Sequence, residues 1–291
     1  MPKPPSIIPS EVEGRTNLNA AIRAVAAYLG EGPDPATARL DAELLAAHVA
    51  GVSRENLLLS PPSEFDTARY EGLARRRFGG EPLAHITGAA EFWSLPLEVN
   101  ADVLIPRPDT ETLIELALEL RADEAPKTIL DLGTGSGALL MAALSEFPRA
   151  EGLGLDMSTE AILVASRNAD RLQLADRASF LIGGWEAVER GPFDLILCNP
   201  PYIDEADELG PSVREHEPHH ALFAELGGLA AYEAIFPRLA RLLGPAGVAI
   251  FEVGAGQGAE VREIAARHRL SMRASRKDLG GHERALAFAV T

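Results

Sequence analysis

From residue 128 onward the sequence alternates short apolar runs with helix-like segments, and this rhythm constrains the fold more than any other feature. Runs typical of buried strands occur at 128–132, 151–156, 178–182, 193–198, 246–253, 270–274 and 284–290. Helical patterns lie between them at 136–146, 158–171, 228–243 and 257–267. The alternation predicts an α/β domain with a mostly parallel, seven-stranded sheet and helices on both faces. No helix separates the last two strands, so we expect them to form an antiparallel hairpin at one edge.

The residues before this domain, which we place at 106–291, follow other patterns. Residues 1–16 carry four prolines without apolar periodicity and are expected to form a loose, flexible leader. Residues 17–87 repeat apolar side chains at three- and four-residue spacing, which predicts a small helical-bundle domain. Residues 88–105 alternate apolar and polar side chains and predict a β-hairpin linker.

The composition limits which binding partners and which cellular compartment we expect for this protein. Acidic residues outnumber basic ones by 43 to 27, and the formal charge of −16 repels a phosphate backbone, so we expect no direct nucleic-acid partner. No apolar stretch is long enough for a bilayer-spanning helix, and the first residues lack the pattern of a signal peptide. Cys198 is the only cysteine, which excludes an internal disulfide. We therefore expect a cytoplasmic protein with no membrane partner.

A glycine loop directly follows the first strand of the α/β domain, in the sequence Asp131-Leu132-Gly133-Thr134-Gly135-Ser136-Gly137. Glycines permit a tight turn and let a ligand approach the free amides at the start of the next helix. Asp156 ends the second strand roughly 20 residues later, where a carboxylate accepts hydrogen bonds from ribose hydroxyls. Together these features predict a nucleotide-like cofactor.

The glycines alone leave the cofactor's identity open. With Ala138 the loop satisfies the loose dinucleotide pattern G-x-G-x-x-A, which also suits a nicotinamide cofactor. Asp131 would repel a pyrophosphate but would attract the ammonium of a methionine moiety, which favours S-adenosylmethionine. The alternative role of Asp131 is structural, as a strand-end residue that accepts amide hydrogens of the turn.

The tetrapeptide Asn199-Pro200-Pro201-Tyr202 follows the fourth strand, so it should face the same crevice as the glycine loop. Its two prolines fix φ and make a stiff turn. The Asn199 side-chain oxygen and the Pro200 carbonyl would each accept one hydrogen of a planar –NH₂ group, with Tyr202 packed on its π-face. This arrangement predicts methylation of an –NH₂ nitrogen, with Asn199, Pro200 and Tyr202 as catalytic residues; a plain turn after a strand is the alternative.

Three motifs taken together resemble the peptide-chain release factor glutamine N(5)-methyltransferases. They are Ile105-Pro106-Arg107-Pro108-Asp109-Thr110-Glu111, the glycine loop with Asp131, and Asn199-Pro200-Pro201-Tyr202-Ile203. The resemblance covers nearly the whole chain and implies a Rossmann-like class I methyltransferase domain behind the helical domain. It implies S-adenosylmethionine as cofactor, S-adenosylhomocysteine as product, and class 1 peptide-chain release factors as protein partners, methylated on the glutamine of their Gly-Gly-Gln motif. We expect the chain to act as a monomer.

The resemblance also implies roles for residues that match the family motifs. Residues 133–137 would contact the methionine and ribose parts of the cofactor, with Asp156 on the ribose and Trp185 on the adenine; Asn199 would border both cofactor and substrate. Residues 199–202 would hold the substrate amide. The loop containing Glu217 would shape the substrate pocket, and Arg107 would either reach the crevice or form a surface salt bridge. One departure is Gly184, since the family commonly has an acidic residue before this tryptophan.

Several alternatives stay open. Histidines near Glu217, at positions 216, 219 and 220, suggest a metal site, but the resemblance needs none and we expect no metal. A related enzyme class that methylates a glutamine of a large-subunit ribosomal protein shares the tetrapeptide. Adenine amino-group methyltransferases of nucleic acids use a similar tetrapeptide. A cofactor-binding sensor without turnover is the non-enzymatic alternative.

Overall fold

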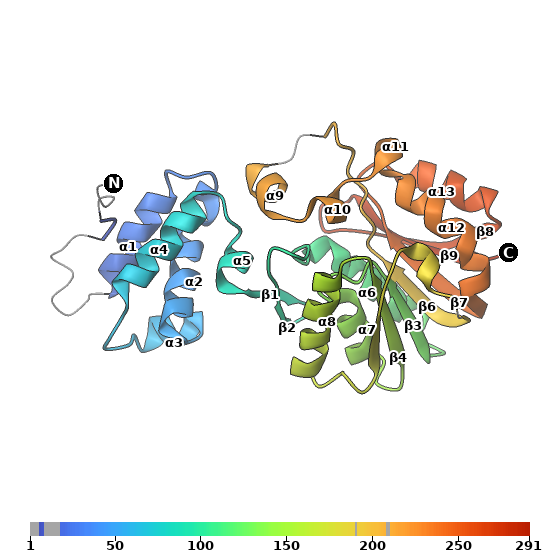
Figure 1. Cartoon of the computed structure of the whole chain (residues 1–291), viewed down its shortest axis with the longest axis horizontal. Helices are drawn as coiled ribbons and strands as arrows, with labels where there is room; N and C mark the ends of the chain where they lie inside the picture. The colour runs from blue at the N-terminus through green and yellow to red at the C-terminus, as the bar shows by residue number, and fades with distance from the viewer. Residues whose placement is uncertain (1–5, 9–17, 190, 208–209) are drawn as a thin grey trace. The chain divides into compact units, whose positions relative to one another are not determined.

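The structure, a computed structural model, describes residues 6–8, 18–189, 191–207 and 210–291. The chain forms two compact units, shown in Figure 1. The helical unit comprises Met1–Gly88 together with Gly210–His216, and the α/β unit comprises Ala89–Leu209 together with Glu217–Thr291. No helix in the described part of the chain has the length and apolar character needed to span a membrane.

The helical unit packs its helices around one apolar core. The helices from the N-terminal part are α1 (Leu18–Leu29), η2 (Pro35–Thr37), α2 (Ala38–Ala50), α3 (Arg54–Leu59), α4 (Thr67–Phe78) and α5 (Leu83–Thr87). The apolar face expected of the first helix is buried, since Ile22 and Val25 are at most 1% exposed. Most of the expected leader, 1–16, lies outside the described residues. Its described part contacts the core through Ile8, which is buried and whose amide donates to Glu71.

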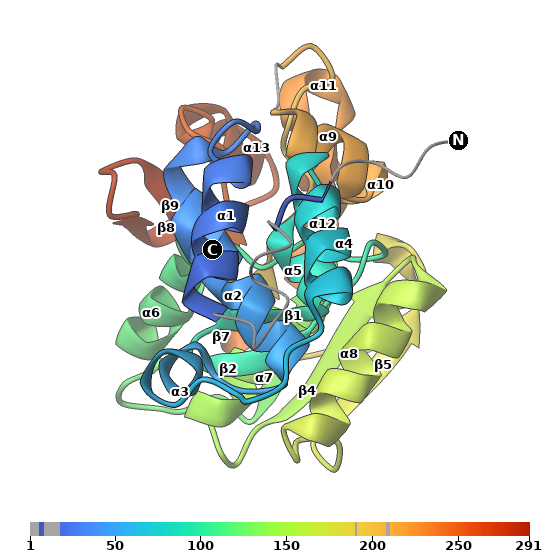
Figure 2. The same ribbon diagram turned by 90° about the vertical axis from the view of Figure 1, so that its left-hand side faces the viewer.

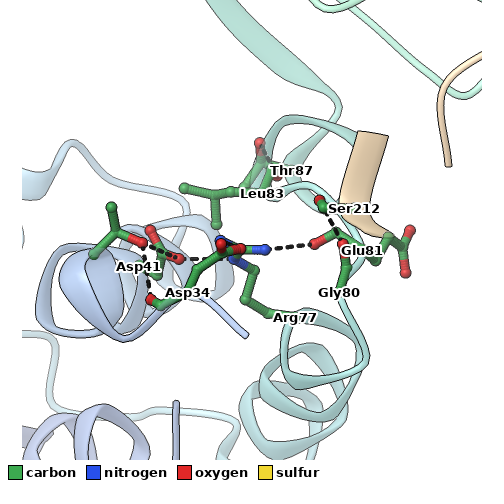
Figure 3. A network of polar contacts seen from close by, with 9 residues as sticks. Asp34, Asp41, Arg77, Gly80, Glu81, Leu83, Thr87 and Ser212 are labelled. Atoms are coloured by element: carbon green, nitrogen blue, oxygen red, sulfur yellow. Dashed lines mark hydrogen bonds and ion pairs between the residues drawn. The ribbon is translucent and has the colours of Figure 1, made fainter. Parts of the chain in front are cut away.

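A buried arginine organises one end of this unit (Figure 3). The Arg77 guanidinium donates to Asp41 over 2.7 Å and to Asp34 over 2.6 Å, and it also donates to the carbonyl of Glu81. These bonds hold the turn that follows α4. The hydroxyl of Ser212, in helix α9 (Pro211–His216), donates to the Gly80 carbonyl in that turn over 2.7 Å. A segment distant in sequence therefore belongs to the helical unit.

The α/β unit begins with a small hairpin. Strands β1 (Ala89–Phe92) and β2 (Leu95–Glu98) pair antiparallel, as expected for a hairpin within 88–105. The two-residue turn between them consists of Trp93 and Ser94, both at positive φ. Such φ values match the twist of the flanking strands.

The larger sheet has seven strands in the order β5-β4-β3-β6-β7-β9-β8. They are β3 (Thr128–Leu132), β4 (Glu151–Asp156), β5 (Ala178–Ile182), β6 (Phe193–Cys198), β7 (Leu243–Glu252), β8 (Leu270–Lys277) and β9 (Glu283–Val290). The first five are parallel to one another, and β9 pairs antiparallel with both β7 and β8. The expected fold class and the antiparallel hairpin at the edge are confirmed.

Helices cover both faces of this sheet, so alternate residues of the central strand β3 are buried on opposite sides. Ile129 packs into one apolar core, whereas Leu130 and Leu132 pack into the other. The long helices are α6 (Glu111–Leu120), α7 (Ala138–Glu146), α8 (Thr159–Arg171), α12 (Ala230–Leu242) and α13 (Gly258–Arg267). Figure 2 shows α8 lying along β4 and β5. The short elements are η3 (Pro108–Thr110), η4 (Trp185–Ala187), α10 (His219–Leu222) and α11 (Glu225–Gly228).

Candidate active site

The carboxyl ends of the parallel strands meet at one edge of the sheet, where ligands bind in folds of this kind. A cavity of about 410 Å³ lies there. Its lining includes six of the predicted site residues, which are Gly133, Gly135, Asp156, Trp185, Asn199 and Pro201. A smaller cavity of about 60 Å³ is lined by Arg107, Thr110, Asp131, Thr134, Ser136 and again by Gly133, Gly135 and Asn199. The glycine loop and Asn199 therefore border both cavities.

The glycine loop has the backbone that its sequence indicates. Gly133, Gly135 and Gly137 all have positive φ, at 74°, 53° and 81°. The amides of Gly133 and Thr134 both donate to the Leu155 carbonyl, so the end of β4 holds the loop. A Cβ on Gly133 would lie 3.4 Å from the Trp185 ring. The loop therefore favours glycine at this position for its positive φ, whereas a Cβ there would make only an ordinary contact with the tryptophan ring.

Asp156 supports this loop and also faces the larger cavity. Its Oδ2 accepts a hydrogen bond from the Gly135 amide and its Oδ1 accepts one from the Ser158 amide, both over 2.9 Å. A carboxylate oxygen has capacity for a further hydrogen bond. Asp156 is therefore placed to accept from hydroxyl groups of a ligand while it holds the loop.

Asp131 lies below the loop and is 1% exposed. Its Oδ2 accepts a hydrogen bond from the Thr134 hydroxyl over 2.6 Å, and its Oδ1 has no hydrogen-bond partner among the described residues. Burial, with a smaller contribution from the negative charge of Asp156, raises the pKa of Asp131 to about 7. A cation in the smaller cavity would restore the charged form, so this site fits the ammonium of a methionine moiety.

Trp185 begins the short helix η4, and an acidic side chain, Glu186, lies beside Gly184. A Cβ on Gly184 would lie 2.7 Å and 2.8 Å from the two carboxylate oxygens of Glu186. The Glu186 side chain therefore fills the space beside Gly184, and both residues line the larger cavity with Trp185. The sequence reasoning missed Glu186, although an acidic residue directly after the tryptophan was a visible signal.

The tetrapeptide leaves β6 with Asn199 at the cavities and Pro200 buried behind it. The Asn199 Nδ2 donates to the Thr110 hydroxyl oxygen over 3.2 Å, so its Oδ1 is not used in that bond. The Tyr202 hydroxyl donates to Glu252 Oε1 over 3.0 Å. Burial raises the pKa of Tyr202, which keeps the phenol protonated.

The backbone of Tyr202 is held from the opposite side by Gln257. The Gln257 amide nitrogen donates to the Tyr202 carbonyl over 2.9 Å and to the Gly227 carbonyl over 3.1 Å. Gly228, at a φ of 82°, approaches so closely that a Cβ there would lie 2.0 Å from the Tyr202 carbonyl oxygen. The tetrapeptide is therefore a rigid element rather than a free loop.

Arg107 and Glu217, both expected at the substrate, contact each other. The Arg107 guanidinium donates to Glu217 Oε1 over 2.5 Å, and Glu217 Oε2 accepts from the Ile105 amide over 3.2 Å. The Glu217 side chain is 1% exposed and that of Arg107 is 37% exposed. Arg107 thus forms an ion pair with a buried partner and also lines the smaller cavity. Their contact with a substrate stays a prediction.

Other predicted site residues lie outside the cavity linings. Gly137, Pro200, Tyr202 and Glu217 line neither of the two cavities. Sequence reasoning also missed Thr110, Glu252 and Gln257 as partners of the tetrapeptide. The only sequence signal for Glu252 is an acidic residue at the end of the apolar run 246–253.

Comparisons with known proteins agree with this geometry. Residues 20–88 match the family model of the PrmC N-terminal domain, and residues 123–252 match that of a methyltransferase domain. The fold of the hMettl16 catalytic domain, solved in complex with the MAT2A 3'UTR hairpin 6, is similar with a TM-score of 0.55. That similarity covers 68% of this chain and 77% of the other at 17% identity, so it bears on the fold alone.

Full-length relatives are considerably closer in sequence. A release factor glutamine methyltransferase of Bradyrhizobium diazoefficiens is 41% identical, over 93% of this chain and 94% of the relative. One of Rhodospirillum rubrum is 43% identical, over 85% of this chain and 78% of the relative. With this similarity over both units, and with the glycine loop and the Asn-Pro-Pro-Tyr turn at one cavity, the chain belongs to the release factor glutamine methyltransferase family.

Proposed function

We propose that this enzyme transfers a methyl group from S-adenosylmethionine to the side-chain amide nitrogen of the glutamine in the Gly-Gly-Gln motif of class 1 peptide-chain release factors. One observation carries the proposal. Asn199 lies where the two cavities meet at the glycine loop, with its Nδ2 directed to Thr110 and its Oδ1 left for a ligand. A hydrogen-bond acceptor beside a cofactor loop is what methylation of an amide nitrogen requires.

The residues around the cavities fit the cofactor. Asp131 offers a carboxyl oxygen without a partner, in a cavity next to Arg107, for the charged methionine end. Gly133, Gly135 and Asp156 line the larger cavity, where Asp156 would accept hydrogen bonds from the ribose hydroxyls, and Trp185 lines the same cavity, where its ring would contact the adenine. When bound, S-adenosylmethionine supplies an electrophilic methyl group on a sulfonium ion.

The protein's own part in the reaction is to hold and orient the amide. An amide nitrogen is a poor nucleophile, because its lone pair is delocalised into the carbonyl. Alignment of the reacting atoms within roughly 3–3.5 Å lowers the barrier. The Asn199 Oδ1 and the Pro200 carbonyl would each accept one N–H of the glutamine, and both oxygens stabilise the positive charge that develops on nitrogen. One proton leaves the nitrogen after the transfer, so no base is needed before it.

The experiment is methyl transfer from labelled cofactor to purified release factor, read by mass spectrometry. We expect label on the Gly-Gly-Gln glutamine and none when that glutamine is replaced by alanine. Parallel reactions with a large-subunit ribosomal protein and with adenine-containing DNA and RNA test the two other substrate classes. Label on either of these but not on the release factor would overturn the proposal.

The remaining expectations about partners follow from this function. We propose that the enzyme acts in the cytoplasm, because release factors work on ribosomes, and that it acts as a monomer that meets its protein substrate directly. The charge of −16 supports a protein substrate over a nucleic acid. Sedimentation velocity at micromolar concentration tests the monomer, and a dimer that survives dilution would contradict it.

A further inference from the structure

The turn that follows β5 places the side chain of Glu186 at the wall of the larger cavity. At the start of this turn the Gly183 amide donates to the Asp156 carbonyl over 2.8 Å. The Ala187 amide donates to the Gly184 carbonyl over 3.0 Å and closes the turn. Glu186 is therefore held close to the end of β4, where Asp156 is expected to bind the ribose of the cofactor.

Glycine at position 184 leaves room for the Glu186 carboxylate. Gly184 has a φ of −75°, which any residue adopts, so its backbone conformation does not require glycine. A Cβ at this position would nevertheless lie 2.7 Å from Glu186 Oε2 and 2.8 Å from Glu186 Oε1. The carboxylate therefore occupies the space that a side chain at position 184 would fill.

The exposed carboxylate of Glu186 has no hydrogen-bond or ion-pair partner among the residues that the structure describes. The Glu186 carbonyl accepts a hydrogen bond from Arg238 Nη2 over 3.0 Å. Glu186, Arg238 and Arg241 also line a second cavity of about 340 Å³. Gly184 lines the larger cavity and not this second one. Because both carboxylate oxygens lie beside Gly184, they are available to a ligand in the larger cavity.

The other carboxylates that line the larger cavity already have partners in the protein. Asp156 accepts hydrogen bonds from two backbone amides, one on each oxygen. Asp102 accepts one from Asn100 Nδ2 over 2.9 Å. Within the described part of the chain, Glu186 is thus the carboxylate of this cavity that a ligand meets without a competing protein donor.

The order of the groups in S-adenosylmethionine indicates which of them meets Glu186. The methionine end is expected at Asp131 in the smaller cavity and the ribose at Asp156. The adenine is attached to the ribose, so it would lie in the part of the larger cavity beyond Asp156, which Met157 and Trp185 line. An indole ring and a thioether provide apolar surface for a planar base. The 6-amino group at the edge of that base offers two N–H donors.

We propose that Glu186 recognises the adenine, with its carboxylate accepting one N–H of the 6-amino group, and so selects adenine over purines that lack this group. The proposal rests on the proposed function for the position of the cofactor, and it extends that function because it names the group that selects the base. An ionised carboxylate accepts hydrogen bonds and donates none, so it favours a base with a donor at this position. Asp156 and Trp185 do not supply this selectivity, because ribose hydroxyls and an aromatic face are common to purine nucleosides.

The test compares the binding of two ligands by calorimetry at constant pH. They are S-adenosylhomocysteine and the same compound with unsubstituted purine in place of adenine. Wild type should bind the adenine compound roughly tenfold more tightly, because it gains a hydrogen bond to a charged acceptor. Glu186→Ala should bind the two compounds within about twofold of each other, and comparison of the two ratios isolates the contact between carboxylate and amino group. Equal ratios in wild type and Glu186→Ala would overturn the inference.

A second variant removes the contact without replacing Glu186. The φ of Gly184 permits alanine, but in Gly184→Ala the added methyl group takes the place of the carboxylate, so the preference for adenine should fall as in Glu186→Ala. Glu189→Ala is the matched control, because this exposed glutamate lines only the second cavity, and it should keep the wild-type preference. Asp102→Ala should keep it as well. A preference that is lost in Asp102→Ala but kept in Glu186→Ala would assign the amino group to Asp102 and overturn the inference.

The two proposals fail in different ways. Wild type that binds the adenine compound with the expected preference but labels no glutamine overturns the proposed function and leaves the role of Glu186 in place. Wild type that labels the Gly-Gly-Gln glutamine, while Glu186→Ala and Gly184→Ala keep its preference for adenine, overturns the inference alone.

Discussion

Two buried carboxyl groups border the site at the scale of single residues. The Asp131 carboxyl lies near the glycine loop and the Glu252 carboxyl lies near the tetrapeptide, and each residue is 1% exposed. Each accepts one hydroxyl hydrogen and has a second oxygen without a partner among the described residues. Burial raises the pKa of both to about 7. A buried polar atom without a hydrogen-bond partner lowers the free energy of unfolding, so each of these two carboxyl groups makes the folded protein less stable.

The stability cost of Glu252 should depend on pH. The folded protein holds this proton up to about pH 7, whereas the unfolded chain releases it near 4.5. Between these values the folded state binds more protons, so the free energy of unfolding falls as the pH rises, and it is constant above 7 with respect to this group. Glu252→Gln lacks this slope and should gain about 2–3 kcal/mol relative to wild type between pH 5 and 8. Urea unfolding at both pH values measures the gain; an equal difference at both would contradict it.

Asp131 should make cofactor affinity pH-dependent in the opposite direction. An ammonium group binds the ionised carboxylate, so S-adenosylhomocysteine should bind more tightly as the pH rises through about 7. Asp131→Asn should bind it at least about tenfold more weakly at pH 8 and lose the pH dependence, because one charge-assisted hydrogen bond is removed. Calorimetry between pH 5.5 and 8.5 provides the dissociation constants. A mutant with wild-type affinity at pH 8 would assign Asp131 to the structural role.

At the scale of elements, the glycine loop joins β3 to α7 by backbone conformations that other residues rarely adopt. Gly137 precedes the first residue of α7 with a φ of 81°, and a Cβ there would lie 3.2 Å from the Ala165 side chain of α8. Both the close contact and the positive φ disfavour any residue larger than glycine at position 137. The packing of α7 against α8 therefore depends on this glycine.

Gly137→Ala should destabilise the protein by about 1–2 kcal/mol or more, since the left-handed conformation alone costs that much for an L-residue. Gly72→Ala is the matched control, because Gly72 lies inside α4 and a Cβ there meets nothing within 4 Å. It should stabilise its helix by up to about 1 kcal/mol. Thermal unfolding of both variants measures the difference. Equal effects of the two substitutions would show that the positive φ at Gly137 carries no strain.

At the scale of the whole molecule, the chain has two units with separate cores, so its unfolding need not follow a single transition. The two tryptophans, Trp93 and Trp185, both lie in the α/β unit. Tryptophan fluorescence therefore reports on that unit alone, whereas far-ultraviolet circular dichroism reports on both. The helical unit is held by Arg77, whose side chain is 10% exposed between Asp34 and Asp41.

Arg77→Met should lower the stability of the helical unit by about 3 kcal/mol, because it leaves the buried Asp41 without its cation. The circular dichroism transition should move to lower urea concentration while the fluorescence transition stays in place. Arg76→Met is the control: Arg76 pairs with Glu81, is 46% exposed, and should change stability by less than about 1 kcal/mol. A joint shift of both signals in Arg77→Met would mean that the two units unfold together.

Local patterns determined much of this protein without any structure. The strands at 128–132, 151–156, 178–182 and 193–198 have the boundaries that the apolar runs predict. In β3 and β6 the reason is burial on both faces of the sheet, which requires apolar residues along most of the strand. The glycine loop and the stiff turn at Asn199 are likewise properties of adjacent residues.

Only the tertiary structure decided which distant residues meet. Thr110 and Asn199 are 89 positions apart, and Tyr202 and Glu252 are 50 apart. The pairing of Arg107 with Glu217, and the inclusion of Gly210–His216 in the helical unit, are of the same kind. Such contacts depend on strand order and on the paths of the loops at the strand ends. Periodicity along the chain shows which nearby residues share a face of a helix or strand, but it does not show the order of the strands in the sheet. The hydrogen bond between Asn199 and Thr110 therefore became known only from the folded molecule.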